Sequence, residues 1–392
     1  MVAAGVRLAN RRSFLGQSLA TGGVGLLAGC ATSAAGPGPP GFIPAASLAP
    51  IRAGGGRIMN ITVCLRPFRA VGPRLDAETV GSKLVVHNYG HGGSGWSLCW
   101  GSGQVAVKTA LAGGEKDIAV IGCGALGLAA ATLAQRAGAR VTIYAKERMP
   151  EVRSARATGI WSPDSRIALA GSVGPEFPAF WEDMARTSFR IHQRYLGFAD
   201  APVEWTDRYT LSDTPFSAPP PDRIGFAHYG ARVQDLTPPV EDIDRKRHPF
   251  AVPYARKTSL PMFNITAYGH VLLSDFLQAG GRIETIEFHT PADLESLKQK
   301  VVINCTGYGA RALWKDESIV PVRGQIAWLI PQPEVRYGVY YRGVSTLSRR
   351  DGIVVQRTGM DESYGFNDAN EQPDRADAIA AAATIAGLFP AT

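Results

Sequence analysis

The chain has 392 residues, a formal net charge of +7 and an ordinary hydrophobic content of 45%. This length is enough for two domains or for one large α/β unit. The positive charge comes from scattered arginines without dense basic runs, which argues against nucleic acid as a partner and leaves contact with anionic lipid or wall polymer open. Because no His/Cys/Asp cluster has the spacing of metal ligands, we expect no metal site.

The first residues resemble an export signal. Residues 10–15 contain a twin-arginine motif, residues 15–27 form an apolar stretch too short to span a bilayer, and residues 27–30 match the lipobox of lipoproteins. Residues 31–57, rich in Ala, Gly and Pro, are expected to be a disordered tether. We therefore expect export by the twin-arginine route and a periplasmic or extracytoplasmic protein, lipid-anchored through Cys30. The alternative is a chance apolar N-terminus.

Two glycine-rich loops follow, each between a strand pattern and a helix pattern. In the first, residues 85–101, the loop glycines Gly90, Gly92, Gly93 and Gly95 allow the backbone to approach a flat or anionic group. In the second, an apolar strand over 117–121 leads into the glycine pattern of 122–127, then a helix and a strand over 140–144. This is the βαβ context that a dinucleotide fingerprint requires.

The glycines of the second loop have distinct expected roles. Gly122 permits the tight turn, Gly124 lets the backbone approach a pyrophosphate, and Gly127 lets the helix pack on the strand. An acid near the end of the second strand should bind a ribose hydroxyl, and Glu147 lies near that place with Lys146 before it. The loop alone leaves NAD and FAD both open.

Several segments together resemble the D-amino-acid oxidase family of FAD enzymes. They include an Arg-Pro motif and a His-Gly-Gly signature, and their positions are 62–69, 87–101, 156–163, 262–266, 302–307 and 323–326. The resemblance implies an α/β protein: a Rossmann-like FAD-binding domain with a parallel sheet, plus a mostly antiparallel α+β substrate domain. The expected FAD-binding domain comprises residues 58–165 and 255–312, and the expected substrate domain 166–254 and 313–380.

The order of these motifs departs from the family. The Arg-Pro motif and the His-Gly-Gly signature stand near the C-terminus in the family, whereas here they come first. We expect a circular permutation, in which a helix over 104–111 continues through 112–115 into the strand that begins at 117. The alternative is a rearranged chain that folds poorly.

The resemblance also implies a substrate site. Arg66 would hold the substrate carboxylate through two parallel hydrogen bonds, and the backbone of Gly93 would touch the substrate amine. Tyr340 and Tyr341 would line the substrate pocket, so Arg66, Gly93 and Tyr340 are the catalytic candidates. The alternatives are a salt bridge for Arg66 and an ordinary strand position for the tyrosines. A second pocket tyrosine has no counterpart in residues 344–348.

The resemblance carries over a set of cofactor-binding residues. Lys146 stands where the family has its ribose-binding acid, and Arg153 and Ser154 stand near the pyrophosphate. His91 is expected to be structural rather than a base. The expected FAD-binding residues are Gly122, Gly124, Ala125, Leu126, Gly127, Lys146, Glu147, Arg153, Ser154, Thr158, Gly159, Ile160, Phe288, Thr306, Gly92, Gly93, Gly95, Trp96 and Ser97.

The implied reaction is oxidative deamination of D-amino acids to 2-oxo acids, ammonia and hydrogen peroxide by hydride transfer from Cα to flavin N5. Such a reaction needs positioning and electrostatics and does not strictly require a side-chain base. Two alternatives remain: a dehydrogenase that passes electrons to quinone instead of oxygen, and a flavin-binding or flavin-free remnant without activity. We expect membrane contact only through the lipid anchor, and an oligomer is compatible with the sequence.

Overall fold

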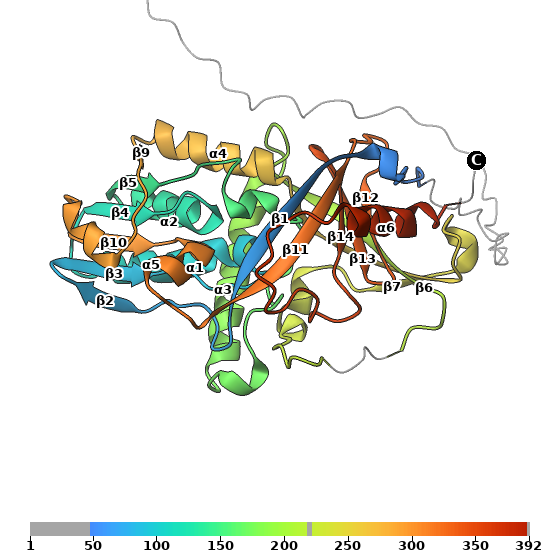
Figure 1. The fold of residues 1–392 in the computed structure, drawn as a ribbon, viewed down its shortest axis with the longest axis horizontal. Helices are drawn as coiled ribbons and strands as arrows, with labels where there is room; N and C mark the ends of the chain where they lie inside the picture. Colours follow the sequence, from blue (N-terminus) through green and yellow to red (C-terminus); the bar gives the residue numbers. More distant parts are fainter. Residues whose placement is uncertain (1–47, 218–221, 390–392) are drawn as a thin grey trace, which may run out of the picture. The chain divides into compact units, whose positions relative to one another are not determined.

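The computed structural model describes residues 48–217 and 222–389 (Figure 1). The chain divides into Met1–Ile43 and Pro44–Thr392, and the described residues belong to the second unit. The expected twin-arginine signal, the lipobox and most of the expected tether lie outside the described residues. Within the described part, no helix has the length and apolar character needed to cross a membrane.

One sheet has six strands in the order β2-β3-β10-β4-β5-β9. All neighbouring pairs are parallel except β2 with β3. Residues 118–121 are buried along their whole length, as a strand covered on both faces should be. The strands are β2 (Ala77–Val80), β3 (Lys83–His87), β4 (Asp117–Ile121), β5 (Arg140–Ala145), β9 (Arg282–Thr285) and β10 (Val301–Asn304).

Closely packed helices accompany this sheet, and small residues allow their approach. A Cβ at Gly101 would lie 2.2 Å from the carbonyl oxygen of Met184, so α1 and α3 meet backbone to backbone. Helix α1 also contacts α2, and α2 contacts α4. The described residues form the α-helices α1 (Gly95–Ala110), α2 (Ala125–Arg136), α3 (Phe177–His192), α4 (Ile265–Gln278), α5 (Ala310–Leu313) and α6 (Arg375–Ala386), the last of which packs against the second sheet.

The second sheet has eight strands in the order β1-β11-β14-β13-β12-β6-β8-β7. Its pairs are antiparallel except β12 with β6, so the expected combination of a parallel sheet with a mostly antiparallel one is confirmed. Helix α6 packs against it, and the Asp374 side chain accepts a hydrogen bond at the helix start. The strands are β1 (Ile58–Arg69), β6 (Val203–Ser212), β7 (Glu241–Ile243), β8 (Tyr254–Phe263), β11 (Ile319–Leu329), β12 (Tyr337–Tyr341), β13 (Val344–Arg349) and β14 (Gly352–Arg357).

Short 3-10 helices complete the described secondary structure. They are Gly55–Arg57, Arg153–Arg156, Ala170–Ser172, Gln193–Tyr195, Gly230–Leu236, Arg245–Arg247, Pro291–Ser296 and Gly307–Gly309.

Sheet membership differs from the expected domain boundaries at two strands. We placed β1 and β8 in the FAD-binding domain, but both belong to the eight-stranded sheet. β1 pairs with β11 from Ile58 to Arg69, and β8 pairs with β6 along its whole length. These long-range pairings decide which sheet a strand joins, and the strand's own sequence does not reveal them.

The last part of the expected tether is packed, so the expectation of disorder is wrong for residues 48–57. Ile51 and Ala53 are buried in a hydrophobic core that also contains Ile385 and Leu388. Figure 1 shows the start of β1, in blue, beside the red helix α6. Composition missed this segment because its apolar residues are few and their partners are distant in the sequence.

A buried hydrogen-bond network joins α1, α3 and α4. Trp100 Nε1 donates to the Tyr268 hydroxyl at 2.8 Å, and that hydroxyl lies 2.9 Å from His192 Nδ1. His192 Nε2 donates to the carbonyl oxygen of Trp96 at 3.1 Å. The neutral imidazole satisfies every one of these contacts, and burial lowers the pKa of His192 to about 3.

We expect this histidine to destabilise the fold as the pH falls below the value at which an unfolded chain binds a proton, about 6.5. The folded pKa lies below the unfolded one, so the unfolded state gains the proton first, and at pH 5 the loss is about 2 kcal/mol. Urea unfolding at pH 7, 6 and 5 measures this loss in the free energy of unfolding. His192→Gln should flatten this pH dependence, whereas His270→Gln, an exposed position on α4, should not. An equal pH dependence in all three proteins would contradict the assignment.

Candidate functional site

A cavity of about 1320 Å³ is lined by residues of both sheets. It is larger than the roughly 300–1,000 Å³ of pockets for drug-sized ligands. Residues just beyond the carboxyl ends of β4, β5 and β10 line it, which is where ligands bind in parallel α/β sheets. The cavity is therefore large enough for a dinucleotide together with a small substrate.

Two helices begin at this cavity. Gly124 precedes α2 and Ser94 precedes α1, and neither helix start has a side-chain cap. The Ala125 N–H donates to Ser154 Oγ at 3.1 Å. Uncapped N–H groups and the positive end of a helix dipole favour anionic groups, so both helix starts are suited to an anionic part of a ligand.

The glycines of the βαβ loop have the geometry that their expected roles require. Gly122 has φ of 99°, and a Cβ there would lie 2.6 Å from the carbonyl oxygen of Cys305. A Cβ at Gly127 would lie 1.9 Å from the carbonyl oxygen of Gly122, so Gly127 brings helix and strand together. Gly127 does not line the cavity, so its part is packing rather than direct contact.

The first glycine loop is held against the segment that contains Ser165 and Arg166. Gly92 has φ of 55°, and a Cβ there would lie 1.9 Å from the carbonyl oxygen of Arg166. The Gly93 N–H donates to the carbonyl oxygen of Ser165 at 3.0 Å. Because this N–H is already used, the carbonyl oxygen is the group of Gly93 that remains a candidate for contact with a substrate amine.

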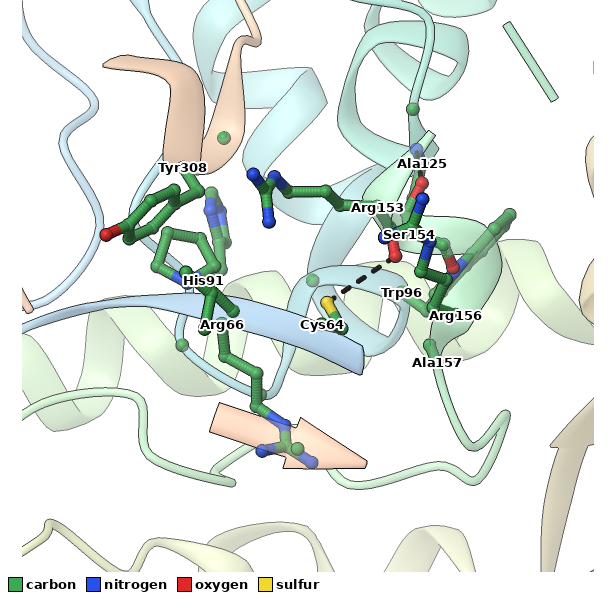
Figure 2. Close-up of a pocket in the computed structure, with 18 of the residues that line it drawn as sticks. Cys64, Arg66, His91, Trp96, Ala125, Arg153, Ser154, Arg156, Ala157 and Tyr308 are labelled. Carbon is green, nitrogen blue, oxygen red and sulfur yellow. Dashed lines mark hydrogen bonds between the residues drawn. The ribbon is translucent and has the colours of Figure 1, made fainter. Parts of the chain in front are cut away.

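Arg66 lies in the cavity without an acid partner. Its guanidinium lies over Gly324 of β11, where a Cβ would be 2.4 Å from Nη2, and its Nη1 donates to the carbonyl oxygen of Arg323 at 3.1 Å. Among the described residues, no carboxylate lies within salt-bridge distance of Arg66, so the alternative of a structural salt bridge is not found. Burial and the charge of Arg166 lower the pKa of Arg66 to about 10. Figure 2 shows Arg66 with Cys64 and His91 among the lining residues.

Only one of the two candidate tyrosines faces this cavity. Tyr340 lines it, donates from its hydroxyl to the carbonyl oxygen of Gly359 at 2.9 Å, and has a pKa raised by burial. Tyr341 instead packs in the hydrophobic core on the α6 side and donates to Asp213 Oδ1 at 2.8 Å. The prediction for Tyr341 is wrong, because neighbouring residues of a strand point to opposite faces.

The charged residues expected near the cofactor have protein partners of their own. Arg153 pairs with both carboxylate oxygens of Glu371, at 2.8 and 3.0 Å, and lies over the ring of Tyr308. The hydrogen bonds from Arg153 lower the pKa of Glu371. Lys146 forms an exposed salt bridge with Glu287 at 3.0 Å, and Glu147, the next residue, also lines the cavity.

The other expected cofactor residues also line this cavity. Segments far apart in the sequence supply them, namely Gly92, Gly93, Gly95, Trp96, Ser97, Gly122, Gly124, Ala125, Leu126, Lys146, Glu147, Arg153, Ser154, Thr158, Gly159, Ile160, Phe288 and Thr306.

His91 is a buried lining residue, and neither of its ring nitrogens has a hydrogen-bond partner within the described protein. Burial lowers its pKa to about 3, so the ring is neutral near neutral pH. A group with this pKa is a poor general base at neutral pH. His91 is therefore suited to shaping the loop or accepting a single hydrogen bond from a ligand.

Sequence reasoning missed a group of charged residues at the cavity. Arg166 pairs with Glu362 at 3.6 Å, while Asp164 accepts the N–H groups of Tyr229 and Gly230. Burial and the nearby Glu362 raise the pKa of Asp164. The missed lining residues also include Arg208. No motif marks these positions, since they meet only when the two sheets pack. Across the described residues, no cluster of three or more His, Cys, Asp or Glu side chains could hold a metal.

Curated relatives match part of this chain. The D-amino-acid oxidase of Streptomyces coelicolor is 26% identical, over 54% of this chain and 58% of its own length. The D-amino acid oxidase of Dugesia ryukyuensis is 27% identical, over 66% of this chain and 74% of its own. The D-amino-acid oxidase of Rubrobacter xylanophilus is 30% identical, over 53% and 57%. This chain thus spans little more than half the length of two of these relatives.

Among solved structures, L-amino acid deaminase from Proteus vulgaris, with its specific insertion sequence deleted, is similar with a TM-score of 0.47. Its identity is 14%, over 70% of this chain and 74% of that one. The sequence profile of the family described as FAD dependent oxidoreductase matches residues 117–391. This segment is well over half of the chain and contains the βαβ loop, and the protein therefore belongs to the FAD dependent oxidoreductase family.

Proposed function

We propose that this protein is an FAD-dependent oxidase that converts D-amino acids to 2-oxo acids, ammonia and hydrogen peroxide. The observation that carries the proposal is the position of Arg66, a partly buried guanidinium without an acid partner among the described residues, in the same cavity as both helix starts. A guanidinium that has no acid partner and is partly shielded from water is an effective partner for an α-carboxylate. The matched relatives named as D-amino-acid oxidases support the D configuration.

The residues present fit FAD. Gly122 and Gly124 line the cavity with bare backbone, and the start of α2 offers the remaining N–H groups and the positive end of a helix dipole for a pyrophosphate. Glu147 is placed to accept from a ribose hydroxyl, and the start of α1 faces the same cavity. When bound, FAD supplies the hydride acceptor of the reaction.

The chain's own residues would then act by positioning. Arg66 would hold the substrate carboxylate through paired hydrogen bonds and so fix the direction of the Cα–H bond. The carbonyl oxygen of Gly93 would accept a hydrogen bond from the amine, and the Tyr340 ring would cover the substrate from water. His91 takes no proton in this scheme, since its pKa of about 3 leaves it a weak base.

The visible spectrum of the purified protein tests this proposal. We expect oxidised flavin in the pure protein and its bleaching when a mixture of D-amino acids is added without oxygen. The L-enantiomers should leave the spectrum unchanged. Oxygen uptake with hydrogen peroxide release would indicate an oxidase, whereas reduction of a quinone analogue without oxygen uptake would favour the dehydrogenase alternative. A flavin-containing protein that no D-amino acid bleaches would contradict the proposed reaction.

We also propose that the chain is circularly permuted relative to the family. The family match begins at residue 117, whereas Arg66 and the glycines at 92, 93 and 95 precede it and still line the same cavity. A permutation would break the family's chain between the end of α6 and the segment before β1. These two segments share a hydrophobic core here, so they remain adjacent. A turn at 111–114 links α1 to β4.

A reordered chain tests the permutation. It begins at residue 114 and carries residues 48–113 after residue 389 through a short Gly-Ser linker. We expect flavin content and activity within about threefold of the natural order, because joining neighbouring chain ends costs little. Inserting residues 48–113 after the exposed Arg350, far along the chain from α6, is the control that should fail to bind flavin. An inactive, flavin-free reordered chain would count against the permutation.

Export remains a proposal that rests on residues 10–30. We propose transport of the folded protein by the twin-arginine route and lipid attachment at Cys30. Cys30→Ser should move the protein from the membrane fraction to a soluble extracytoplasmic fraction. Replacing Arg11 and Arg12 with Lys should retain it in the cytoplasm. Membrane association that survives Cys30→Ser would exclude the lipid anchor as its cause.

A further inference from the structure

Arg208, like Arg66, is a guanidinium that lines this cavity and has no acid partner among the described residues. It stands on β6 opposite Gly338 of β12, and it lines the same cavity as Arg66. Its Nη2 donates to the Ser345 hydroxyl at 3.2 Å, and its guanidinium carbon lies 5.4 Å from the centre of the Tyr340 ring. Its Nε is buried without any hydrogen-bond partner in the described protein.

The neighbouring acids do not neutralise Arg208. Asp207, the next residue along β6, points to the opposite face and accepts from Ser259. Within the described residues no carboxylate forms a salt bridge with Arg208, and burial lowers its pKa. Of the acids that line the cavity, Asp361 pairs with Arg223, Glu362 with Arg166 and Glu287 with Lys146, while Asp164 and Asp222 accept backbone N–H groups.

The buried Nε of Arg208 has no partner in the described protein, and an unsatisfied buried polar group is costly, so an anion bound in this cavity would supply the missing hydrogen bond. The guanidinium of Arg66 lies over β11 and that of Arg208 reaches β13, with β14 between these strands. Two strand spacings correspond to roughly 10 Å. A separation of this size between the guanidinium groups of Arg66 and Arg208 suits a molecule with a carboxylate at each end, of the size of aspartate or glutamate.

We propose that Arg208 binds the side-chain carboxylate of the substrate, so that the preferred substrates are acidic D-amino acids. This inference rests on the proposed function, in which Arg66 holds the α-carboxylate. Tyr340 would lie beneath the side chain of the substrate, and the Ser345 hydroxyl would keep the Arg208 guanidinium in place. Arg208 then acts as a specificity-determining residue rather than as part of the hydride transfer.

The test compares substrates of equal shape and different charge. We expect kcat/KM to be at least tenfold higher for D-aspartate than for D-asparagine, and for D-glutamate than for D-glutamine. Arg208→Gln should lower kcat/KM for the two acids about 100-fold and change it less than threefold for the two amides. Arg208→Lys keeps the charge and should retain part of the preference.

A binding measurement gives an independent readout. Succinate should raise the Tm of the unmodified protein more than propionate does, and Arg208→Gln should abolish this difference. Efficient oxidation of neutral D-amino acids with no preference for the acids would overturn the inference and leave the proposed function standing. An absence of flavin bleaching with any D-amino acid, while succinate still binds through Arg208, would instead refute the proposed function. An equal loss on acids and amides in Arg208→Gln would show a structural role.

Discussion

Arg66→Met is expected to lower kcat/KM for every D-amino acid substrate about 1000-fold while the flavin content stays the same. Each charge-assisted hydrogen bond contributes about 1.5–3 kcal/mol, and methionine removes both. Arg66→Lys retains the charge without the paired geometry and should lose about 10- to 100-fold. Steady-state kinetics with D-alanine and D-aspartate measure these losses.

The stability of the same variant provides a second, opposite expectation. Arg66 is partly buried, and burial together with the nearby charge of Arg166 lowers its pKa to about 10. Methionine in its place should therefore leave the Tm of the flavin-free protein unchanged or raise it. Arg140→Met serves as the control, since Arg140 is exposed and lies 3.6 Å from Asp117. Retention of more than a third of the activity in Arg66→Met would contradict the role of Arg66.

Gly124→Val is expected to weaken flavin binding at least 100-fold, a change of about 2.7 kcal/mol. A Cβ at this position would lie 2.9 Å from Ser154 Oγ, a side-chain atom that can move aside, so the fold should survive. The added methyl groups would occupy the place where the backbone at the start of α2 approaches the pyrophosphate. Fluorescence titration of flavin-free protein with FAD measures the affinity.

Gly113→Val is the matched control, because a Cβ at Gly113 meets nothing within 4 Å. Its flavin affinity should equal that of the unmodified protein. If both valine variants bind FAD normally, the pyrophosphate does not lie against Gly124, and the assignment of the βαβ loop is wrong. The far-ultraviolet circular dichroism spectra of both variants report whether the fold is intact.

Local patterns were sufficient for the parts of the site that lie within one segment. The βαβ loop and its glycines follow from a strand pattern, a glycine spacing and a helix pattern within residues 117–144, and the structure places them as expected. Residues 375–386 are alanine-rich and form α6. In such stretches the residues that form the sequence pattern also make the contacts that fix the local structure.

Features that depend on long-range pairing could not be predicted from the sequence. Arg208 reaches the cavity because β6 pairs in parallel with β12, and nothing near residue 208 signals that pairing. The prediction for Tyr341 is wrong because the resemblance indicates only the region of the strand that lines the pocket. Which of the two tyrosines points into the cavity depends on the alternation of strand faces. Ile51 lies in the expected tether, and its packing could not be predicted because its core partners come from α6, far along the chain.

The pairing of β1 with β11 has a consequence for biosynthesis. Arg66 and its pairing partner Val322 are separated by 256 residues, so β1 leaves the ribosome long before β11 exists. Until then the nascent chain exposes an apolar twelve-residue strand with unpaired backbone groups on both edges. A holdase chaperone that shields this strand during translation should therefore increase the yield of soluble protein. Slowing the refolding of the complete chain from denaturant should increase that yield less, because β11 is then already present.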